Sequence, residues 1–225
     1  MGPEAHAPLV AILDDDQSVQ AALQDLVESE RLPVVCFDSA HDFLESGARF
    51  KVSCLIADIR MPGMSGLELQ AKLKSTGSSI PIIFITALGD IPMAVHAMRE
   101  GAIDFLAKPI NDVDLLKSIE KALQQDCVNR RESIERERFA SRYRTLTPRE
   151  REVLKLLVRG LLNKQTGFEL GIKEYTVQIH RSNIMRKMEA GSFASLVSLA
   201  TKFASEGLDA EQAGAGLLMS SVSAD

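Results

Sequence analysis

The sequence predicts an α/β domain with a doubly wound parallel sheet, followed by a small all-α domain. Over the first 125 residues, short apolar and partly β-branched runs alternate with amphipathic helical segments. Beyond them no convincing strand occurs, and helical patterns stop at glycines. The charge divides in the same way: residues 1–125 hold 18 acidic and 10 basic side chains, whereas residues 146–206 hold 6 and 10. An acidic domain is therefore joined to a modestly basic one, as expected if the second domain meets a polyanion.

Five βα units in series make up the first domain. The expected strands lie at 9–13, 34–37, 54–57, 82–86 and 105–107. The expected helices lie at 17–28, 40–46, 66–74, 92–100 and 112 to about 129. Because crossovers between parallel strands are right-handed, this alternation predicts a flavodoxin-like five-stranded sheet with helices on both faces.

The second domain begins with a helix-start signal at Thr147, Pro148 and Glu150. The threonine can cap the helix, the proline suits its first position, and the glutamate completes a capping box. This helix stops at Gly160. Three more are expected at 163–170, 175–188 and 192–206. The four short helices predict a small bundle.

The segment between the domains is charged on all sides of a helix and holds few apolar residues. It predicts an exposed helical linker. The expected organisation is a flexible N-terminus (1–7), the α/β domain (8–125), the linker (126–145), the helical domain (146–206) and a disordered tail rich in Gly, Ala and Ser (207–225).

The composition limits the class of protein. With 225 residues, of which 45% are hydrophobic and 25% charged, the chain can form two small packed domains. Residues 1–6 show neither the basic region nor the long apolar region of a targeting segment, and the longest apolar runs are only of strand length. We therefore expect a cytoplasmic protein without a membrane partner. Cys36, Cys54 and Cys127 form no CxxC pair. Buried free thiols are expected rather than a zinc or redox site.

Four aspartates follow two of the expected strands. Asp14, Asp15 and Asp16 come after the first strand, and Asp58 comes after the third. In a doubly wound sheet these strands are central neighbours, and ligands bind beyond their carboxyl ends. Because clustered carboxylates repel one another, a cation is expected among them, and an all-oxygen site suits Mg²⁺. Asp16 is expected only to cap the next helix.

The fourth and fifth strands add a hydroxyl from Thr86 and an ammonium group from Lys108. Each has an ordinary structural interpretation, Thr86 as a β-branched strand residue and Lys108 as a surface charge. Together with Mg²⁺, the lysine would offset three carboxylates and leave a place for phosphoryl oxygens. The combination predicts a phosphoryl site around Asp58.

Residues 8–125 closely resemble the receiver domain of two-component response regulators. The matching segments are 13–16, 58–66, 84–87 and 101–109. The resemblance implies that a sensor histidine kinase transfers a phosphoryl group to Asp58, and that the protein is not a turnover enzyme. The Mg²⁺ ligands that it implies are Asp14, Asp15, Asp58 and the backbone carbonyl of Arg60. Lys108 would pair with the phosphoryl oxygens, Thr86 would move to bond them, and Phe105 would be drawn inward. The bond between Lys108 and Pro109 is cis in this family.

The segment 163–188 has the lengths of a helix, a turn and a second helix, as in DNA-reading units. An ordinary helical hairpin has the same spacing. Composition favours DNA, because one side of the second helix is polar and basic while Val177, Ile184 and Met188 recur on the other.

Residues 146–206 resemble the helix-turn-helix of the LuxR or NarL type, and together with the receiver they resemble the FixJ subgroup. The matching motifs are 146–154, 163–164, 176–181 and 187–188. The resemblance implies that Gln178, Ile179 and Ser182 approach base edges. The phosphate contacts that it implies are Lys164, Lys173, Thr176, Arg181 and Lys187. The last helix would supply a dimer contact on DNA.

The helical domain departs from this family pattern at two places. Gly167 stands where alanine is usual, with an expected loss of roughly 0.5 to 1 kcal/mol in helix propensity. Lys173, Glu174 and Tyr175 replace the usual small-proline-arginine lead into the reading helix. We expect weaker DNA binding or an unusual sequence preference.

The sequence thus predicts a transcription regulator switched by phosphorylation of Asp58. Phosphorylation would favour a homodimer through residues 92–129, binding to promoter DNA and contact with RNA polymerase. Three alternatives are a Mg²⁺ phosphohydrolase, a phosphoacceptor that acts by protein contact alone, and a nucleotide-binding domain. The first lacks a second acid, because Arg60 holds that position, and the last lacks a glycine-rich phosphate loop.

Overall fold

The structure is a computed structural model that describes residues 7–87 and 91–207. The chain divides into two compact units, Met1–Arg131 and Glu132–Asp225, which are treated separately below. Most of the expected flexible N-terminus and nearly all of the expected tail lie outside the described residues. In the described part of the chain, no helix has both the length and the apolar character needed to cross a lipid bilayer.

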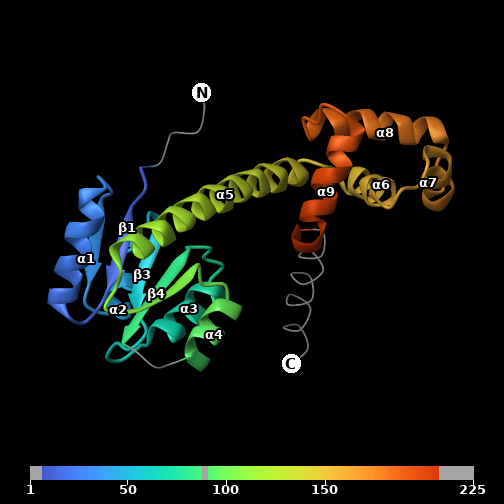
Figure 1. The fold of residues 1–225 in the computed structure, drawn as a ribbon. Helices are drawn as coiled ribbons and strands as arrows, with labels where there is room; N and C mark the ends of the chain where they lie inside the picture. The colour runs from blue at the N-terminus through green and yellow to red at the C-terminus, as the bar shows by residue number, and fades with distance from the viewer. Residues whose placement is uncertain (1–6, 88–90, 208–225) are drawn as a thin grey trace, which may run out of the picture. The chain divides into compact units, whose positions relative to one another are not determined.

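The first unit is a parallel sheet with strand order β2-β1-β3-β4-β5 (Figure 1). Its strands are β1 (Val10–Leu13), β2 (Val34–Phe37), β3 (Cys54–Asp58), β4 (Ile82–Ala87) and β5 (Asp104–Lys108). Because the order reverses at β1 and β3, this is the doubly wound, flavodoxin-like sheet that the sequence predicts.

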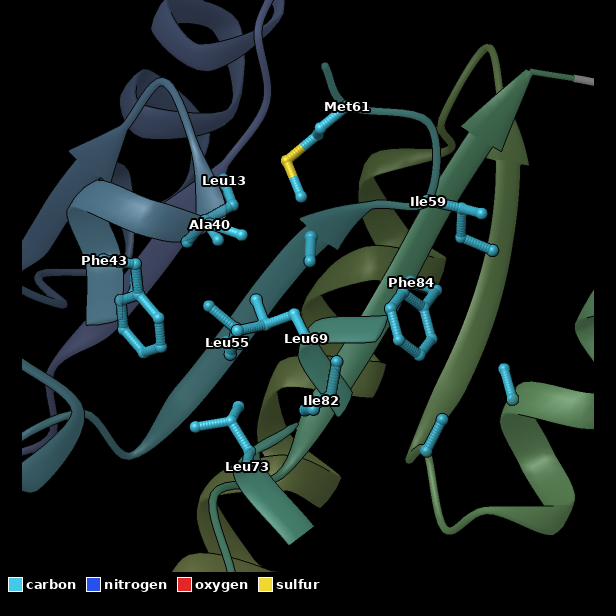
Figure 2. Packing of buried hydrophobic residues seen from close by; sticks show 14 of the residues in the cluster. Leu13, Ala40, Phe43, Leu55, Ile59, Met61, Leu69, Leu73, Ile82 and Phe84 are labelled. Atoms are coloured by element: carbon cyan, nitrogen blue, oxygen red, sulfur yellow. The ribbon is translucent and has the colours of Figure 1, made fainter. Parts of the chain in front are cut away.

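Helices cover both faces of this sheet. They are α1 (Gln17–Ser29), α2 (Ala40–Glu45), α3 (Gly66–Ser75), α4 (Ile91–Arg99) and α5 (Asp112–Arg144), with a 3₁₀ turn at Ala48–Phe50. Leu23 of α1 and Leu115 of α5 belong to the core on one face. Phe43 of α2, Leu69 of α3 and Ala97 of α4 belong to the core on the other face (Figure 2). Each face is thus closed by its own hydrophobic layer.

Three strands, β3, β4 and β5, extend one residue further toward their carboxyl ends than the sequence predicts. Asp58 pairs with Ile85, and Lys108 pairs with Ala87, within the parallel ladder. Both charged residues are therefore positioned by the sheet backbone and not by a loop. The peptide bond between Lys108 and Pro109 is cis, as the family resemblance implies.

Residues 126–145, which the sequence predicts to be an exposed linker, are partly buried in the structure. All but the last of them lie within the single helix α5, and the boundary between the two units falls inside the same helix. Asp126 is buried, and Arg130 binds both its carboxylate and the Val52 carbonyl in the first unit. Phe139 and Tyr143 are buried in the core of the second unit. These two aromatic residues, one turn apart, bury one side of the end of a charged helix.

The second unit is helical. Beside the end of α5 it contains α6 (Pro148–Val158), α7 (Asn163–Leu170), α8 (Glu174–Lys187) and α9 (Phe193–Gly207). Its core joins Val153 of α6, Ile184 of α8 and Phe203 of α9 to Phe139 of α5. The predicted capping box is present, with Thr147 and Glu150 bonding each other's backbone N–H groups.

The cysteines differ in part from the expectation of buried thiols. All three are free, as expected. Cys54 is buried in the sheet and Cys36 is half-buried, but Cys127 is exposed on α5. Position 127 faces solvent, although the apolar residues near it in the sequence had suggested a buried thiol.

Candidate functional site: an acidic cluster and a helix-turn-helix

Three aspartates meet where β1 and β3 end, as the sequence predicts. Asp14 follows the last residue of β1, and Asp58 is the last residue of β3, the neighbouring strand. With Asp15 they offer carboxylate oxygens that all lie within 4.8 Å of one another. Asp14 and Asp58 are buried and Asp15 is exposed. Solvent therefore reaches the cluster at Asp15.

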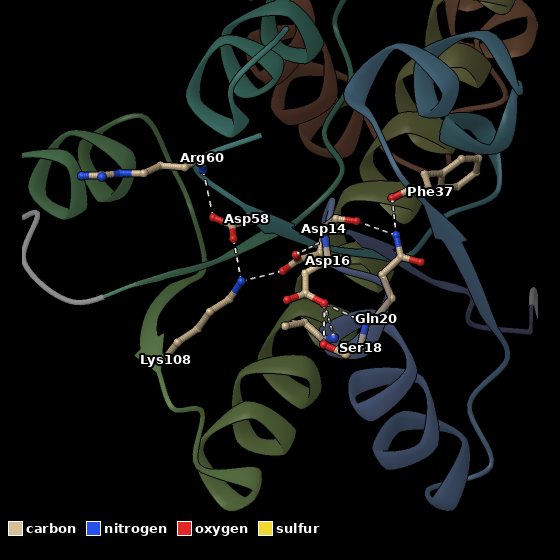
Figure 3. Close-up of polar contacts among 9 residues, drawn as sticks. Asp14, Asp16, Ser18, Gln20, Phe37, Asp58, Arg60 and Lys108 are labelled. Carbon is tan, nitrogen blue, oxygen red and sulfur yellow. Dashed lines mark hydrogen bonds and ion pairs between the residues drawn. The ribbon is translucent and has the colours of Figure 1, made fainter. Parts of the chain in front are cut away.

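Lys108 connects two of these carboxylates (Figure 3). Its Nζ atom lies 2.7 Å from Asp14 Oδ2 and 2.6 Å from Asp58 Oδ2. Burial lowers the pKa of Lys108, but the two carboxylates favour the ammonium form, so the pKa is raised overall. The lysine is charged at neutral pH and partly compensates the acids that surround it.

Backbone groups hold both buried carboxylates in place. The Asp16 N–H donates to Asp14 Oδ1 over 3.0 Å, and the Arg60 N–H donates to Asp58 Oδ1 over 2.9 Å. The Gln20 side chain, which the sequence did not single out, donates to the Asp14 carbonyl over 2.6 Å and so ties α1 to the end of β1. No sequence signal distinguishes this glutamine from a surface residue of α1.

Asp16 has the separate role that was predicted for it. It is the N-cap of α1, and its carboxylate accepts a hydrogen bond from the Ser18 N–H over 2.8 Å. The bonds from the Ser18 hydroxyl and N–H keep the pKa of Asp16 below its usual value. One of the four acids thus belongs to the helix and three remain for a ligand.

The other predicted site residues lie in β4, in β5 and just after β3. Thr86 is buried in β4 and pairs with Ala107, the residue before Lys108. Phe105 is half-buried in β5 and packs against the core beneath α2, α3 and α4. The Arg60 side chain extends away from the carboxylates (Figure 3), so among its groups only the backbone faces Asp58.

A glycine fixes the loop that carries Arg60. The Gly66 N–H donates to the Ile59 carbonyl over 3.0 Å at the start of α3. A Cβ atom on Gly66 would lie 2.6 Å from the Asp58 carbonyl oxygen and 2.9 Å from Phe84. Only glycine lets α3 begin this close to the end of β3. The loop is thereby held beside Asp58.

The donor set suits a hard divalent cation. Three carboxylates within reach of one point, one of them exposed, provide oxygen ligands and leave room for water. A cation there would relieve the repulsion that Lys108 only partly offsets. The cluster therefore fits Mg²⁺, the cation that the sequence predicts.

The second unit presents a helix, turn and helix in α7, residues 171–173 and α8. Gln178, Ile179 and Ser182, predicted to approach base edges, are exposed on α8. Lys164 and Lys173 are exposed, and Thr176 is half-buried. These positions agree with the predicted contacts without testing them.

Two of the predicted phosphate contacts are engaged inside the domain. The Arg181 guanidinium lies 3.8 Å from the centre of the Phe193 ring, a cation–π contact. Lys187 Nζ lies 2.6 Å from Glu150 Oε2, and the Lys187 and Glu150 side chains are 26% and 5% exposed. Lys187 therefore serves as the counter-charge of the buried Glu150, and the phosphate contact that the resemblance implied for it stays a prediction.

Gly167 is expected to be required by the turn. A Cβ atom at this position would lie 2.7 Å from the Ile172 carbonyl oxygen. Gly167→Ala is therefore expected to lower the free energy of unfolding of the second unit by about 1 to 3 kcal/mol, although alanine favours helices. Thermal unfolding followed by circular dichroism measures this. Gly191→Ala is the matched control, because a Cβ atom there meets nothing within 4 Å. An increase in stability for Gly167→Ala would contradict the steric argument.

Comparison with known proteins agrees with both halves of this description. Residues 10–120 match the family described as response regulator receiver domain, and residues 144–200 match bacterial regulatory proteins of the luxR family. The response regulator protein TodT of Pseudomonas putida is 48% identical over 192 residues, which cover 85% of each chain. The transcriptional regulatory protein FixJ of Bradyrhizobium diazoefficiens is 38% identical over 193 residues, covering 86% of this chain and 94% of its own.

Solved structures give the same result. The response regulator StyR aligns with a TM-score of 0.72 and 47% identity over 87% of this chain and 99% of its own. Full-length FixJ from B. japonicum aligns with a TM-score of 0.52 and 38% identity over 86% of this chain and 96% of its own.

A receiver fold with an acidic cluster, joined to a helix-turn-helix domain, defines a response regulator of a two-component system. The chain belongs to the response regulators that carry a LuxR-type DNA-binding domain, and FixJ proteins are among its relatives. It is accordingly a transcription regulator and not a turnover enzyme such as the phosphohydrolase considered above.

Proposed function

We propose that Asp58 accepts a phosphoryl group from the phosphohistidine of a sensor histidine kinase. The observation that carries this proposal is the position of its carboxylate, 2.6 Å from Lys108 Nζ and within 4.8 Å of the Asp14 and Asp15 carboxylates. A nucleophile, a cationic side chain and an acidic cation site thus meet at the carboxyl edge of the sheet, from the ends of β1, β3 and β5. A P–O bond to Asp58 forms as the P–N bond to the kinase histidine breaks.

Asp14, Asp15, Asp58 and the backbone carbonyl of Arg60 would hold Mg²⁺ at this site. When bound, the ion neutralises charge on the transferring phosphoryl group. Lys108, now shared between Asp14 and Asp58, turns to the phosphoryl oxygens and keeps them in place.

The phosphoryl group then shifts an equilibrium of the receiver. The Thr86 hydroxyl bonds a phosphoryl oxygen, and Phe105 moves inward from its half-buried position beside the core. The altered face of α4, β5 and α5 favours a homodimer. The dimer binds promoter DNA in the cytoplasm and contacts RNA polymerase.

The helix-turn-helix supplies the DNA contacts of this dimer. Exposed Gln178, Ile179 and Ser182 on α8 approach base edges in the major groove. The phosphate contacts are Lys164, Lys173, Thr176 and Arg181.

The proposal is tested on the full-length protein with acetyl phosphate or beryllofluoride in the presence and absence of Mg²⁺. We expect Mg²⁺-dependent modification, a larger sedimentation coefficient and tighter binding to DNA selected in vitro by the modified protein. Unchanged sedimentation and unchanged DNA binding on modification would contradict the switch. Modification and dimerisation without binding to any selected or genomic DNA would favour regulation by protein contact alone.

A further inference from the structure

The outward face of α8 contains more residues than the three to which base contacts were assigned above, Gln178, Ile179 and Ser182. Val177 and Ile184 are buried and seven residues apart, which fixes the inner side of this helix. At 100° per residue, the opposite side carries Tyr175, Gln178, Ile179, Ser182 and Arg186, and all five are exposed. The face therefore begins with a tyrosine at the second residue of α8.

No structural role within the domain explains why a tyrosine occupies this exposed position at the start of α8. Its side chain is 71% exposed, and none of the hydrogen bonds among the described residues involves its hydroxyl. A large ring on the surface of a small domain is informative when it has no packing partner and lies on a functional face. A phenol combines an apolar ring with a polar end, which suits a surface that is covered on binding.

The basic residues at the two ends of the outward face of α8 favour DNA as the partner that covers Tyr175. Lys173 precedes it in the turn, and Arg186 ends the same outward face, and both are exposed. Glu174 is the acid on α8, and it lies about 100° from the tyrosine around the helix axis. The amino-terminal end of a helix also carries a partial positive charge. A polyanion is therefore favoured at both ends of the face.

We propose that Tyr175 is a specificity-determining residue for operator DNA. Its ring and hydroxyl contact a base edge in the major groove, next to the bases approached by Gln178 and Ile179. A thymine methyl group suits the ring, and an acceptor such as purine N7 suits the hydroxyl. This inference rests on the proposed DNA binding of the second unit and adds a residue that determines which DNA sequence is bound.

The test uses the full-length protein, activated with beryllofluoride and Mg²⁺. The operator is first selected in vitro by the protein that retains Tyr175. Tyr175→Ala is expected to weaken binding to that operator about tenfold and to leave binding to random-sequence DNA unchanged. Repeating the selection with the variant should lose the preference at one base pair of each half-site. Phe50→Ala is the control, because Phe50 is an aromatic residue of similar exposure, 72%, in the first unit.

A second variant distinguishes base contact from phosphate contact. Tyr175→Arg is expected to strengthen binding to random-sequence DNA, to reduce the ratio of specific to random binding, and to steepen the salt dependence by about one counterion. Equal losses on both DNAs for Tyr175→Ala, or no loss, would overturn the assignment while leaving DNA binding intact. If the activated protein that retains Tyr175 selected no DNA, the proposed function itself would be overturned.

Discussion

Asp58→Asn is expected to abolish phosphoryl acceptance. A carboxamide is a poor nucleophile and cannot form the acyl phosphate, although it fits the same space and can still accept a hydrogen bond from the Arg60 N–H. The variant should show no Mg²⁺-dependent gain of a phosphoryl group with acetyl phosphate by intact-protein mass spectrometry. It should also lose any increase in dimerisation and operator affinity caused by phosphorylation, a complete loss of the switch.

Asp16→Asn is the matched control for this substitution. It makes the same chemical change one residue from the cluster, in a side chain that caps α1, and asparagine caps helices as well as aspartate. Phosphoryl acceptance should remain close to that of the unmodified protein. If Asp58→Asn were still modified at an unchanged rate, Asp14 or Asp15 would be the acceptor and the proposed role of Asp58 would be wrong.

Lys187→Met is expected to destabilise the second unit strongly. The substitution keeps the length of the side chain but leaves the Glu150 carboxylate, 5% exposed, without the ammonium 2.6 Å away. Removing one partner of a buried pair leaves an uncompensated charge, which at this partly exposed lysine costs about 1 to 3 kcal/mol. Thermal unfolding of the full-length protein at neutral pH measures the loss in the transition of the second unit.

The effect should depend on pH in a defined direction. Burial raises the pKa of Glu150, but the Lys187 ammonium and the Thr147 N–H and hydroxyl lower it more, so its pKa in the folded protein is below the usual 4.5. A carboxylate with a lowered pKa stabilises the fold fully above pH 4.5, and this contribution is lost as the pH falls through the folded value. The difference between Lys187→Met and the unmodified protein should therefore be largest at neutral pH and should shrink in acid.

Two controls separate the ion pair from other causes. Lys164→Met removes an exposed lysine and is expected to change stability by less than about 0.5 kcal/mol. The double variant Glu150→Gln with Lys187→Met should recover part of the loss, because a neutral amide needs no counter-charge. A Lys187→Met protein with unchanged stability but weaker DNA binding would instead support the phosphate contact that the family resemblance implied.

Most of the fold could be predicted because its signals are local. Apolar runs and helical periodicity lie within a few residues of one another, and they located the five strands and the helices on both faces of the sheet. The end of α5 could not be located in this way. Phe139 and Tyr143 have few apolar neighbours in the sequence, and their partners, such as Phe203, belong to a distant helix.

The acidic cluster could be predicted for a different reason. A carboxylate that follows a central strand lies at the binding edge of a parallel sheet, so strand assignment places Asp14, Asp15 and Asp58 without knowledge of side-chain contacts. Gln20 was missed because its hydrogen bonds are made to groups beyond its own helix, the backbone carbonyls of Asp14 and Phe37 and the Asp38 carboxylate. Nothing in its own neighbourhood of the sequence signals those partners.

The sequence by itself determined which residues meet at the edge of the sheet, because local patterns locate the strands and a doubly wound sheet makes the first and third central neighbours. Helical periodicity and composition likewise located the helix-turn-helix. Only the tertiary structure decided how individual charges and small residues are used. It paired Lys187 with Glu150, 37 residues away, and placed the Ile172 carbonyl where a side chain on residue 167 would lie. Such contacts depend on how separate elements pack, since burial makes an unpaired charge or an overlapping atom costly.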